Sequence, residues 1–345
     1  MTDHQPLHFA IIGCGRIAPR HAQALHSLEE SHSVRLTATF DVIASRADHL
    51  AKEYGARAYP SYQAVLDDPQ IQVVSICVPS GLHVAVASEA ARAGKHVLVE
   101  KPIAINLQDA DHLIEICEQQ GVTLGVVLQN RFNPPMRDLR ALVDSGKLGK
   151  IMLGNATVRW YRPQEYYEDD WHGTWALDGG ALMNQSIHHI DALQWLMGDV
   201  ESVYAYTATL AHRMEAEDVG VAVVRFKSGA LASIEGSTIT YPENLEGSVT
   251  LFGERGSVKV GGTALNRKIF WKVAGEMEHE RETLTREELD PPSVYGYSHR
   301  EQVAEMVDAI REKRLPTTHG REARRSLQLV CAIYESARSR KEVLL

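Results

Sequence analysis

The first third of the chain alternates short apolar runs with segments of helical periodicity. The run His8–Gly13 (HFAIIG) stops at a glycine, and Ala18–Glu30 then has the pattern of a helix. Further strands are predicted at Val34–Phe40, Val73–Val78, Val97–Val99 and Val122–Leu128, and further helices at Ala44–Tyr54, His83–Ala93 and Leu107–Gln120. This repeated strand–helix order predicts a doubly wound parallel sheet with helices on both faces over residues 1–128.

The pattern changes after about Gln129. Helices are predicted at Arg137–Ser145 and Ala181–Met197, a loop at 163–180, and strands at Ile151–Tyr161, Ser202–Ala211, Val219–Phe226, Ala230–Gly236, Ser248–Phe252, Ser257–Val260 and Lys268–Val273. Consecutive strands with short turns indicate an antiparallel sheet, and helices at Arg300–Lys313 and Gly320–Ser339 close the chain. The predicted fold class is therefore α/β, with residues 129–345 forming an α+β domain on a large, mostly antiparallel sheet.

Composition narrows the class of protein. The 345 residues are 44% hydrophobic and 23% charged, as in an ordinary globular protein of two domains. A net charge of −9 lacks the cationic footprint of a nucleic-acid binder. We see no apolar stretch long enough for a membrane span and no secretory signal pattern. The four cysteines form no CxxC motif, so we expect a reducing, cytoplasmic setting.

A glycine motif follows the first predicted strand. Gly13-Cys14-Gly15-Arg16-Ile17-Ala18 opens the first helix, where the first glycine allows a tight turn and the second lets the backbone approach a pyrophosphate. The N–H groups at the helix start then bind the phosphates. Asp41 ends the second strand, where its carboxylate would bind the adenosine ribose and repel a 2′-phosphate. The motif therefore predicts a Rossmann domain that binds NAD rather than NADP.

Polar residues gather at three further strand ends. These are Pro79-Ser80-Gly81-Leu82-His83, Glu100-Lys101-Pro102 and Gln129-Asn130-Arg131. An open α/β sheet binds its ligands at the carboxyl ends of its strands. The three clusters therefore extend the predicted ligand site beyond the glycine turn.

These residues resemble the Gfo/Idh/MocA family of NAD(P)-dependent oxidoreductases over nearly the whole chain. The resemblance is carried by the GCGRIA turn, the VPSGLH segment, the Glu100-Lys101-Pro102 triplet, the segment from Gly179 to His188, and Tyr334-Glu335-Ser336-Ala337. It implies that Lys101 lies beside the nicotinamide and the substrate hydroxyl. The family also pairs an Asp with a His four residues later, and Asn184 and His188 match those positions, so the acid is replaced here.

The segment around His188 also has a pattern of its own. Asn184, His188 and Asp191 are spaced i, i+4, i+7, which predicts that they share one helix face, with Asn184 or Asp191 orienting the imidazole. His189 would point about 100° away and serve packing. His188, His189 and Asp191 diverge too much to hold a metal and lack HExxH spacing, so we predict no metal site.

Within the family, the chain resembles the UDP-N-acetyl-2-amino-2-deoxyglucuronate dehydrogenases. The supporting stretches are Gln129–Asn133, Trp171–Trp175 and Asn184–His189. This resemblance implies NAD-dependent oxidation of the C3 hydroxyl of UDP-N-acetylglucosaminuronic acid in surface-polysaccharide (O-antigen) synthesis. By analogy, 2-oxoglutarate could reoxidise bound NADH.

The motifs and the resemblance together define the predicted site. The predicted catalytic residues are Lys101 and His188. The predicted cofactor-binding residues are Gly13, Gly15, Arg16, Ile17, Asp41, Pro79, Ser80, His83, Glu100, Lys101, Gln129, Trp171 and His172. The predicted substrate-binding residues are Lys101, Asn130, Arg131, Arg159, Tyr161, Asn184, Gln185 and His188.

Some alternatives remain open at this level. Oxidation of an alcohol needs a base, and either Lys101 takes the proton or it shares it with His188. The enzyme could instead be another family dehydrogenase acting on a free sugar or cyclitol. A different class, a non-catalytic NAD(H)-binding regulator, is disfavoured by the presence of both Lys101 and His188. One broad sheet face predicts a homo-oligomer, either a dimer or a tetramer.

Overall fold

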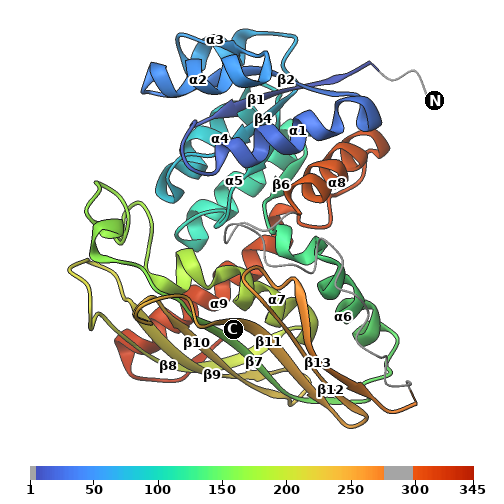
Figure 1. The fold of residues 1–345 in the computed structure, drawn as a ribbon, viewed down its shortest axis with the longest axis vertical. Coiled ribbons are helices and arrows are strands. Elements are labelled where there is room, and N and C mark those ends of the chain that lie inside the picture. Colours follow the sequence, from blue (N-terminus) through green and yellow to red (C-terminus); the bar gives the residue numbers. More distant parts are fainter. Residues whose placement is uncertain (1–4, 276–297) are drawn as a thin grey trace. The chain divides into compact units, whose positions relative to one another are not determined.

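The computed structural model describes residues 5–275 and 298–345, which form two compact units (Figure 1). Unit 1 holds the described residues up to 128 together with 299–324. Unit 2 holds the described residues of 129–298 together with 325–345. Each unit is built around a sheet of its own.

The sheet of unit 1 is parallel throughout its described strands. Its order is β3-β2-β1-β4-β5-β6, which is the doubly wound order predicted from the alternating pattern. The strands are β1 (Leu7–Ile12), β2 (Val34–Phe40), β3 (Arg57–Ala58), β4 (Val73–Ile76), β5 (His96–Val99) and β6 (Leu124–Val126). The polar clusters at the ends of β4, β5 and β6 therefore follow three neighbouring strands.

Helices cover this sheet at the positions where apolar residues recur with helical spacing. They are α1 (Ala18–His32), α2 (Ala44–Tyr54), α3 (Tyr62–Asp67), α4 (His83–Arg92), α5 (Leu107–Gln120) and α8 (His299–Glu312), with a short 3₁₀ turn η1 (Ser80–Leu82). α5 begins at Asn106, whose side chain accepts a hydrogen bond from the Asp109 N–H. The sequence analysis missed β3 and α3, which are too short to show periodicity.

The assignment of all residues after 129 to the second domain is wrong for α8. Residues 299–324 belong to unit 1. Val303, Met306 and Val307 of α8 are fully buried in the same core as Phe9 and Leu25. α8 is amphipathic, and its apolar face is buried against α1. This packing makes α8 part of unit 1.

Unit 2 contains the mostly antiparallel sheet that was predicted. Its order is β13-β12-β11-β7-β10-β9-β8-β14, and only the β7–β10 pair is parallel among the described strands. The strands are β7 (Ile151–Arg159), β8 (Val200–Ala208), β9 (Val219–Phe226), β10 (Leu231–Ser237), β11 (Glu246–Gly253), β12 (Gly256–Gly261), β13 (Arg267–Val273) and β14 (Val343–Leu344). The fold class is thus confirmed as α/β with a second, α+β unit.

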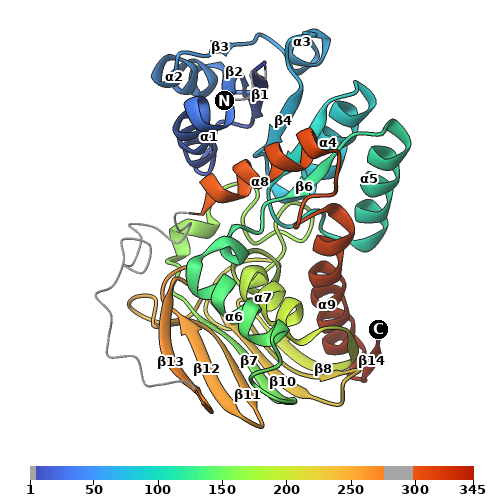
Figure 2. The same ribbon diagram turned by 90° about the vertical axis from the view of Figure 1, so that its right-hand side faces the viewer.

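Helices cover one face of this sheet and, among the described residues, leave the other face bare (Figures 1 and 2). They are α6 (Pro134–Asp144), α7 (Ile187–Met197) and the part of α9 (Gly320–Ser339) that lies in unit 2. Short turns complete the unit: η2 (Gln129–Phe132), η3 (Gln164–Tyr167) and the π-helical turn η4 (Ala181–Gln185). α7 packs on β7 and β11, and α6 packs on β12.

None of the helices within the described residues is both long enough and apolar enough to cross a bilayer.

Candidate active site

The glycine turn of unit 1 has the shape that a dinucleotide requires. Gly13 has φ +86°, and a Cβ there would lie 2.7 Å from the Cys77 carbonyl oxygen, so only glycine fits. A Cβ on Gly15 would meet nothing within 4 Å, which leaves open space beside the second glycine. Arg16 is exposed and Ile17 half-buried at the start of α1. The N-terminus of this 15-residue helix therefore offers its N–H groups to phosphate oxygens.

The Asp41 carboxylate is held beside this turn. Its Oδ2 accepts a hydrogen bond from the Cys14 N–H at 2.7 Å, and its Oδ1 accepts one from the Ile43 N–H at 2.7 Å. Each carboxylate oxygen has two lone pairs, so both retain capacity for a ribose hydroxyl. The glycine turn and Asp41 together fit the pyrophosphate and ribose of NAD.

His83 has a different place from the one predicted. Its imidazole is 1% exposed, with Nδ1 2.7 Å from the Pro102 carbonyl oxygen and Nε2 2.9 Å from the Val78 carbonyl oxygen. Both ring nitrogens are thus occupied by the backbone, and His83 ties the end of β4 to the segment after β5. Among its neighbours, Pro79 is half-buried and Ser80 is buried in η1.

Lys101 follows β5 and is half-buried, and Glu100 before it is buried. The Lys101 backbone N–H donates to Glu100 Oε2 at 3.2 Å. Glu100 Oε1 lies 2.8 Å from His21 Nε2, so this carboxylate is paired with a histidine of α1. Glu100 was predicted as a cofactor contact, and its side chain is used within the protein instead.

The helix predicted over Ala181–Met197 is interrupted in unit 2. Residues 181–185 form a π-turn, in which the Ser186 N–H donates to the Ala181 carbonyl at 2.8 Å, and α7 begins afterwards. Glu217 caps the start of this turn, because its backbone carbonyl accepts from the Ala181 N–H and its Oε1 accepts from the Leu182 N–H. Asn184 and His188 therefore lie in separate helical segments, and the prediction of one shared α-helical face is wrong.

Asn184 has an acidic partner outside the helix. Its amide Nδ2 donates to Asp178 Oδ1, and Asp178 Oδ2 accepts from the Gly173 N–H at 2.8 Å. A carboxylate is thus present near this segment, but it reaches Asn184 from the preceding loop. Asn184 and His188 are both half-buried.

Asp191 does not orient His188 as proposed from its spacing. It forms a two-pronged ion pair with Arg131, with Arg131 Nε 2.8 Å from Oδ2 and Nη2 2.6 Å from Oδ1. Both side chains are at most 4% exposed, and the guanidinium also lies over Trp195. This ion pair uses one edge of the guanidinium that was predicted to bind substrate.

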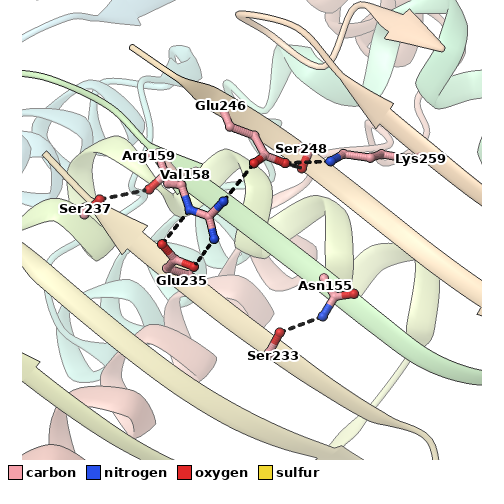
Figure 3. A network of polar contacts seen from close by, with 9 residues as sticks. All are labelled: Asn155, Val158, Arg159, Ser233, Glu235, Ser237, Glu246, Ser248 and Lys259. Atoms are coloured by element: carbon pink, nitrogen blue, oxygen red, sulfur yellow. Dashed lines mark hydrogen bonds and ion pairs between the residues drawn. The ribbon is translucent and has the colours of Figure 1, made fainter. Parts of the chain in front are cut away.

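Arg159 is engaged on the bare face of the sheet (Figure 3). Its Nε and Nη2 donate to Glu235 at 2.7 Å each, and its Nη1 donates to Glu246 at 3.1 Å. Two carboxylates therefore surround a residue predicted to bind an anionic substrate. The structure argues against that role for Arg159.

The remaining predicted substrate contacts of unit 2 lie around an aromatic cluster. Tyr161 packs edge-to-face on Tyr241 with ring centroids 5.6 Å apart. Gln185 Oε1 accepts from Arg162 Nη2 at 2.7 Å, and its amide donates to the Tyr166 hydroxyl at 3.0 Å. Gln185 is therefore held by both an arginine and a tyrosine.

The predicted cofactor contacts of unit 2 are mostly buried. Trp171 stacks on His172 with centroids 3.6 Å apart, and the His172 ring is also paired with Asp169. Gln129 is buried in η2, as is its neighbour Asn130, which was predicted as a substrate contact. No contact of these residues with a dinucleotide follows from unit 2 alone, so their roles stay predictions.

Sequence reasoning missed the group that shapes η4. Glu217 Oε1 accepts hydrogen bonds from the Leu182 N–H at 2.8 Å and from the Tyr334 hydroxyl at 3.0 Å. Burial raises the pKa of Glu217 to about 7, with Asp178 contributing. Tyr334 belongs to the YESA segment that carried part of the family resemblance, and that segment was the signal available in the sequence.

The site of unit 1 defines the class of protein. The glycine turn, helix N-terminus and Asp41 form a dinucleotide site, and residues 7–128 match the family described as "Oxidoreductase family, NAD-binding Rossmann fold". This chain is an NAD-dependent oxidoreductase. Residues 136–259 match the "GFO/IDH/MocA C-terminal domain", so the chain belongs to the Gfo/Idh/MocA family.

Known proteins similar to this chain include two solved dehydrogenases. The WlbA dehydrogenase from Bordetella pertussis, in complex with NADH and UDP-GlcNAcA, is 39% identical with a TM-score of 0.89, covering 99% of both chains. The WlbA dehydrogenase from Chromobacterium violaceum, with the same two ligands, is 38% identical with a TM-score of 0.90, covering 100% of this chain and 97% of the other. Myo-inositol 2-dehydrogenase from Thermotoga maritima is 28% identical over 98% of both chains.

Proposed function

We propose that this enzyme oxidises the C3 hydroxyl of UDP-N-acetylglucosaminuronic acid to the 3-keto sugar, with NAD⁺ as the hydride acceptor. The observation that carries the proposal is the similarity, over nearly the full chain, to two WlbA dehydrogenases solved with NADH and UDP-GlcNAcA. The surface-polysaccharide role inferred from the sequence is part of this proposal.

The chain's own residues would supply binding and proton transfer. When bound, the nicotinamide accepts the hydride from the substrate carbon. Gly13, Gly15 and Asp41 would hold the dinucleotide, as the open space and the fixed carboxylate allow. Lys101 would take the hydroxyl proton or share it with His188.

Asn184 affects how this proton is shared. It is neutral, so it does not stabilise an imidazolium as a carboxylate would, and the nearby Asp191 is already paired with Arg131. Of the two candidates, we therefore favour Lys101 as the base. His188 would donate or accept a hydrogen bond at the same hydroxyl.

The substrate carries a diphosphate and a carboxylate, and net charge −9 gives it no general attraction. Local donors must therefore bind it. We keep Asn130, Arg131, Tyr161 and Gln185 as proposed substrate contacts. Arg159 is no longer among them, since two carboxylates engage it.

The direct test is incubation with UDP-N-acetylglucosaminuronic acid and NAD⁺. We expect NADH absorbance to rise and mass spectrometry to detect a product lighter by two hydrogen atoms. A Lys101→Met/His188→Asn double variant controls for contaminating activity. NADH formation that persists in the double variant, or no product from the wild type, would contradict the proposal.

A second candidate function is oxidation of a cyclitol. The myo-inositol 2-dehydrogenase similarity over 98% of both chains favours it. A panel of UDP-sugars and inositols separates the two candidates, since turnover of inositol alone would select the second. Binding of NADH without turnover of any substrate would favour a non-catalytic regulator.

The acceptor that recycles the cofactor is a separate part of the proposal. We propose that NADH stays bound after sugar oxidation and is reoxidised by 2-oxoglutarate. Adding 2-oxoglutarate to NADH-loaded enzyme should remove the NADH absorbance. Pyruvate serves as the control keto acid.

We also propose that the bare sheet face of unit 2 is covered by a second copy of the chain. It exposes Tyr206, Val221, Val223, Leu231 and Phe252, an apolar set that single chains rarely leave in water. Arg159, Glu235, Glu246 and Lys259 on this face neutralise one another, which lowers the cost of covering them (Figure 3).

Light scattering should show a dimer or tetramer that Val223→Lys dissociates. Lys52→Met on α2 is the control, and a monomeric wild type would contradict the proposal.

All four cysteines are free, which agrees with a cytoplasmic location for an enzyme that uses NAD.

A further inference from the structure

A buried polar cluster in unit 1 has no role in the chemistry above. It combines His21 of α1, Ser75 of β4, Glu100 at the end of β5 and His299 at the start of α8. Their exposed fractions are 1%, 1%, 7% and 4%. Polar groups this deeply buried are costly unless they are paired, so the cluster calls for an explanation.

Three hydrogen-bond contacts join this cluster to Lys101. Ser75 Oγ lies 2.6 Å from His21 Nδ1, and His21 Nε2 lies 2.8 Å from Glu100 Oε1. The other carboxylate oxygen, Glu100 Oε2, accepts the backbone N–H of Lys101 at 3.2 Å. The chain of contacts therefore runs from β4 through His21 to the backbone of the proposed base.

His299 approaches the same carboxylate from another helix. Its Nε2 lies 3.8 Å from Glu100 Oε1, which is too long for a hydrogen bond, and its ring packs edge-to-face on His21. Neither of its ring nitrogens has a hydrogen-bond partner within the part of the chain that the structure describes. A shift of about 1 Å would bring His299 Nε2 within hydrogen-bond distance of Glu100 Oε1. Such a hydrogen bond explains why an imidazole is buried at this position.

The protonation states follow from these contacts. Burial opposes protonation of His21, but Cys77 and Glu100 outweigh it and raise the pKa of His21 to about 10. Burial also opposes ionisation of Glu100, but His21 and His299 hold the pKa of Glu100 well below its usual range. Burial lowers the pKa of His299. The cluster is thus an ionised His21–Glu100 pair with a neutral His299 beside it.

We propose that His21 and His299 are positioning residues for Lys101, acting by holding the Glu100 carboxylate against the Lys101 backbone, with His21 balancing the charge of this carboxylate one residue before Lys101. The inference rests on the proposed role of Lys101 as base. If the His21 charge is lost, the Glu100 carboxylate is left less compensated and favours the Lys101 ammonium. If the Glu100 charge is lost, the ammonium is favoured less.

Other charged or titratable groups face the cluster and are held constant in the test. They are Arg20 on α1, Cys77 after β4 and His83 on α4. None of them is changed in the variants below, so their contribution to the Lys101 titration cancels.

The primary experiment measures the Lys101 amine directly and needs no substrate. Lysines are reductively methylated with ¹³C-formaldehyde, the Lys101 signal is assigned from Lys101→Met, and each protein is titrated by NMR. We expect the Lys101 pKa to rise by about one pH unit in His21→Gln and to fall by a similar amount in Glu100→Gln. His26→Gln, an exposed position on the same helix, should leave it unchanged.

Kinetics then separate positioning from a structural role. In His21→Gln we expect kcat to fall about 10- to 100-fold with little change in KM for NAD⁺, and the alkaline shift of the kcat/KM profile to match the NMR result. His299→Leu should lose activity, whereas His299→Gln should recover most of it, because an amide, like the imidazole, can donate to Glu100 after a small shift.

Each outcome has a distinct meaning. An unchanged Lys101 titration in both His21→Gln and Glu100→Gln overturns the inference, even if the enzyme oxidises the expected sugar. Shifts of opposite sign support it, even if the substrate proves to be a cyclitol. A wild type without turnover counts against the proposed function alone, since the NMR experiment still applies.

A metal ion is the competing explanation for this cluster. His21, Glu100 and His299 offer ligand atoms within 4.8 Å of one another. However, tetrahedral zinc ligands lie about 3.3 Å apart, and His21 Nε2 and Glu100 Oε1 are already at hydrogen-bond distance. Equimolar zinc in the purified protein, with activity lost on chelation, would overturn the positioning role.

Discussion

The buried carboxyl groups near Lys101 in unit 1 and near His188 in unit 2 differ in their charge state. Behind Lys101, Glu100 is ionised and paired with His21, and its pKa lies well below the usual range. Beside the segment that carries His188, the carboxyl of Glu217 has a pKa of about 7, because burial outweighs its hydrogen bonds. Asn184 adds a neutral amide there.

The difference shows that a buried carboxyl takes its charge state from its partners. A histidine within hydrogen-bond distance keeps Glu100 ionised, whereas Glu217 accepts from a backbone N–H and a tyrosine hydroxyl, which are neutral donors. We therefore expect the charged support at Lys101 to matter more for proton transfer than the neutral support near His188.

Replacement of the proposed base should have the largest effect. Lys101→Met should lower kcat/KM for the sugar about 10³-fold, or roughly 4 kcal/mol, because a thioether cannot accept the hydroxyl proton. Steady-state NADH formation measures this, with Lys52→Met on α2 as the matched control. Near-wild-type hydride transfer in Lys101→Met would end the idea that this amine is the base.

The two buried carboxyls should respond to pH with opposite signs. The native pKa of Glu217 is raised from 4.5 to about 7, so its contribution to stability is full below 4.5 and is lost as pH rises towards 7. Glutamine cannot titrate, so Glu217→Gln should remove about 3 kcal/mol of this pH dependence. Urea unfolding at about pH 5 and about pH 8 measures it.

The Glu100 carboxyl provides the comparison in the same experiment. Its pKa is lowered, so its contribution is present above its unfolded pKa and is lost as pH falls. Glu100→Gln should therefore be less sensitive to acid than the wild type. If both variants keep the wild-type slope, the contrast between the two carboxyls is wrong.

Replacement of His188 should lower kcat/KM less than replacement of Lys101. His188→Asn should lower kcat/KM about 10²-fold, or roughly 2.7 kcal/mol, because Asn184 does not stabilise an imidazolium and the lysine remains. His49→Asn, a surface histidine of α2, is the control. A loss as large as that of Lys101→Met would mean that the proton is shared equally.

Replacement of Asp178, which accepts a hydrogen bond from the Asn184 amide, should have the smallest effect. Asp178→Asn removes a charged acceptor from the Asn184 amide and from the Gly173 N–H, which should lower kcat about tenfold. The exposed Asp170→Asn is the matched control. Unchanged kcat together with an unchanged KM for the sugar would show that the loop acid has no part in the site.

Much of the fold could be predicted because local patterns carry it. Apart from the short β3 and α3, the alternating apolar runs placed the strands and helices of residues 5–128 to within a few residues, and the glycine turn and Asp41 lie where the motif requires. The consecutive strands and short turns of unit 2 likewise predicted its mostly antiparallel sheet. The α8 helix was misassigned, because an amphipathic pattern shows that a face is buried but not which core buries it.

The site could be predicted as a set of residue types but not as a set of contacts. The sequence by itself determined the dinucleotide turn, the lysine after Glu100 and the paired histidines, since each depends on neighbours in the chain. Only the tertiary structure decided that Arg131 binds Asp191, that Glu217 caps the turn before α7, and that His21 lies against Glu100. Those partners are 35 to 79 positions apart in the chain, and packing of the whole unit brings them together.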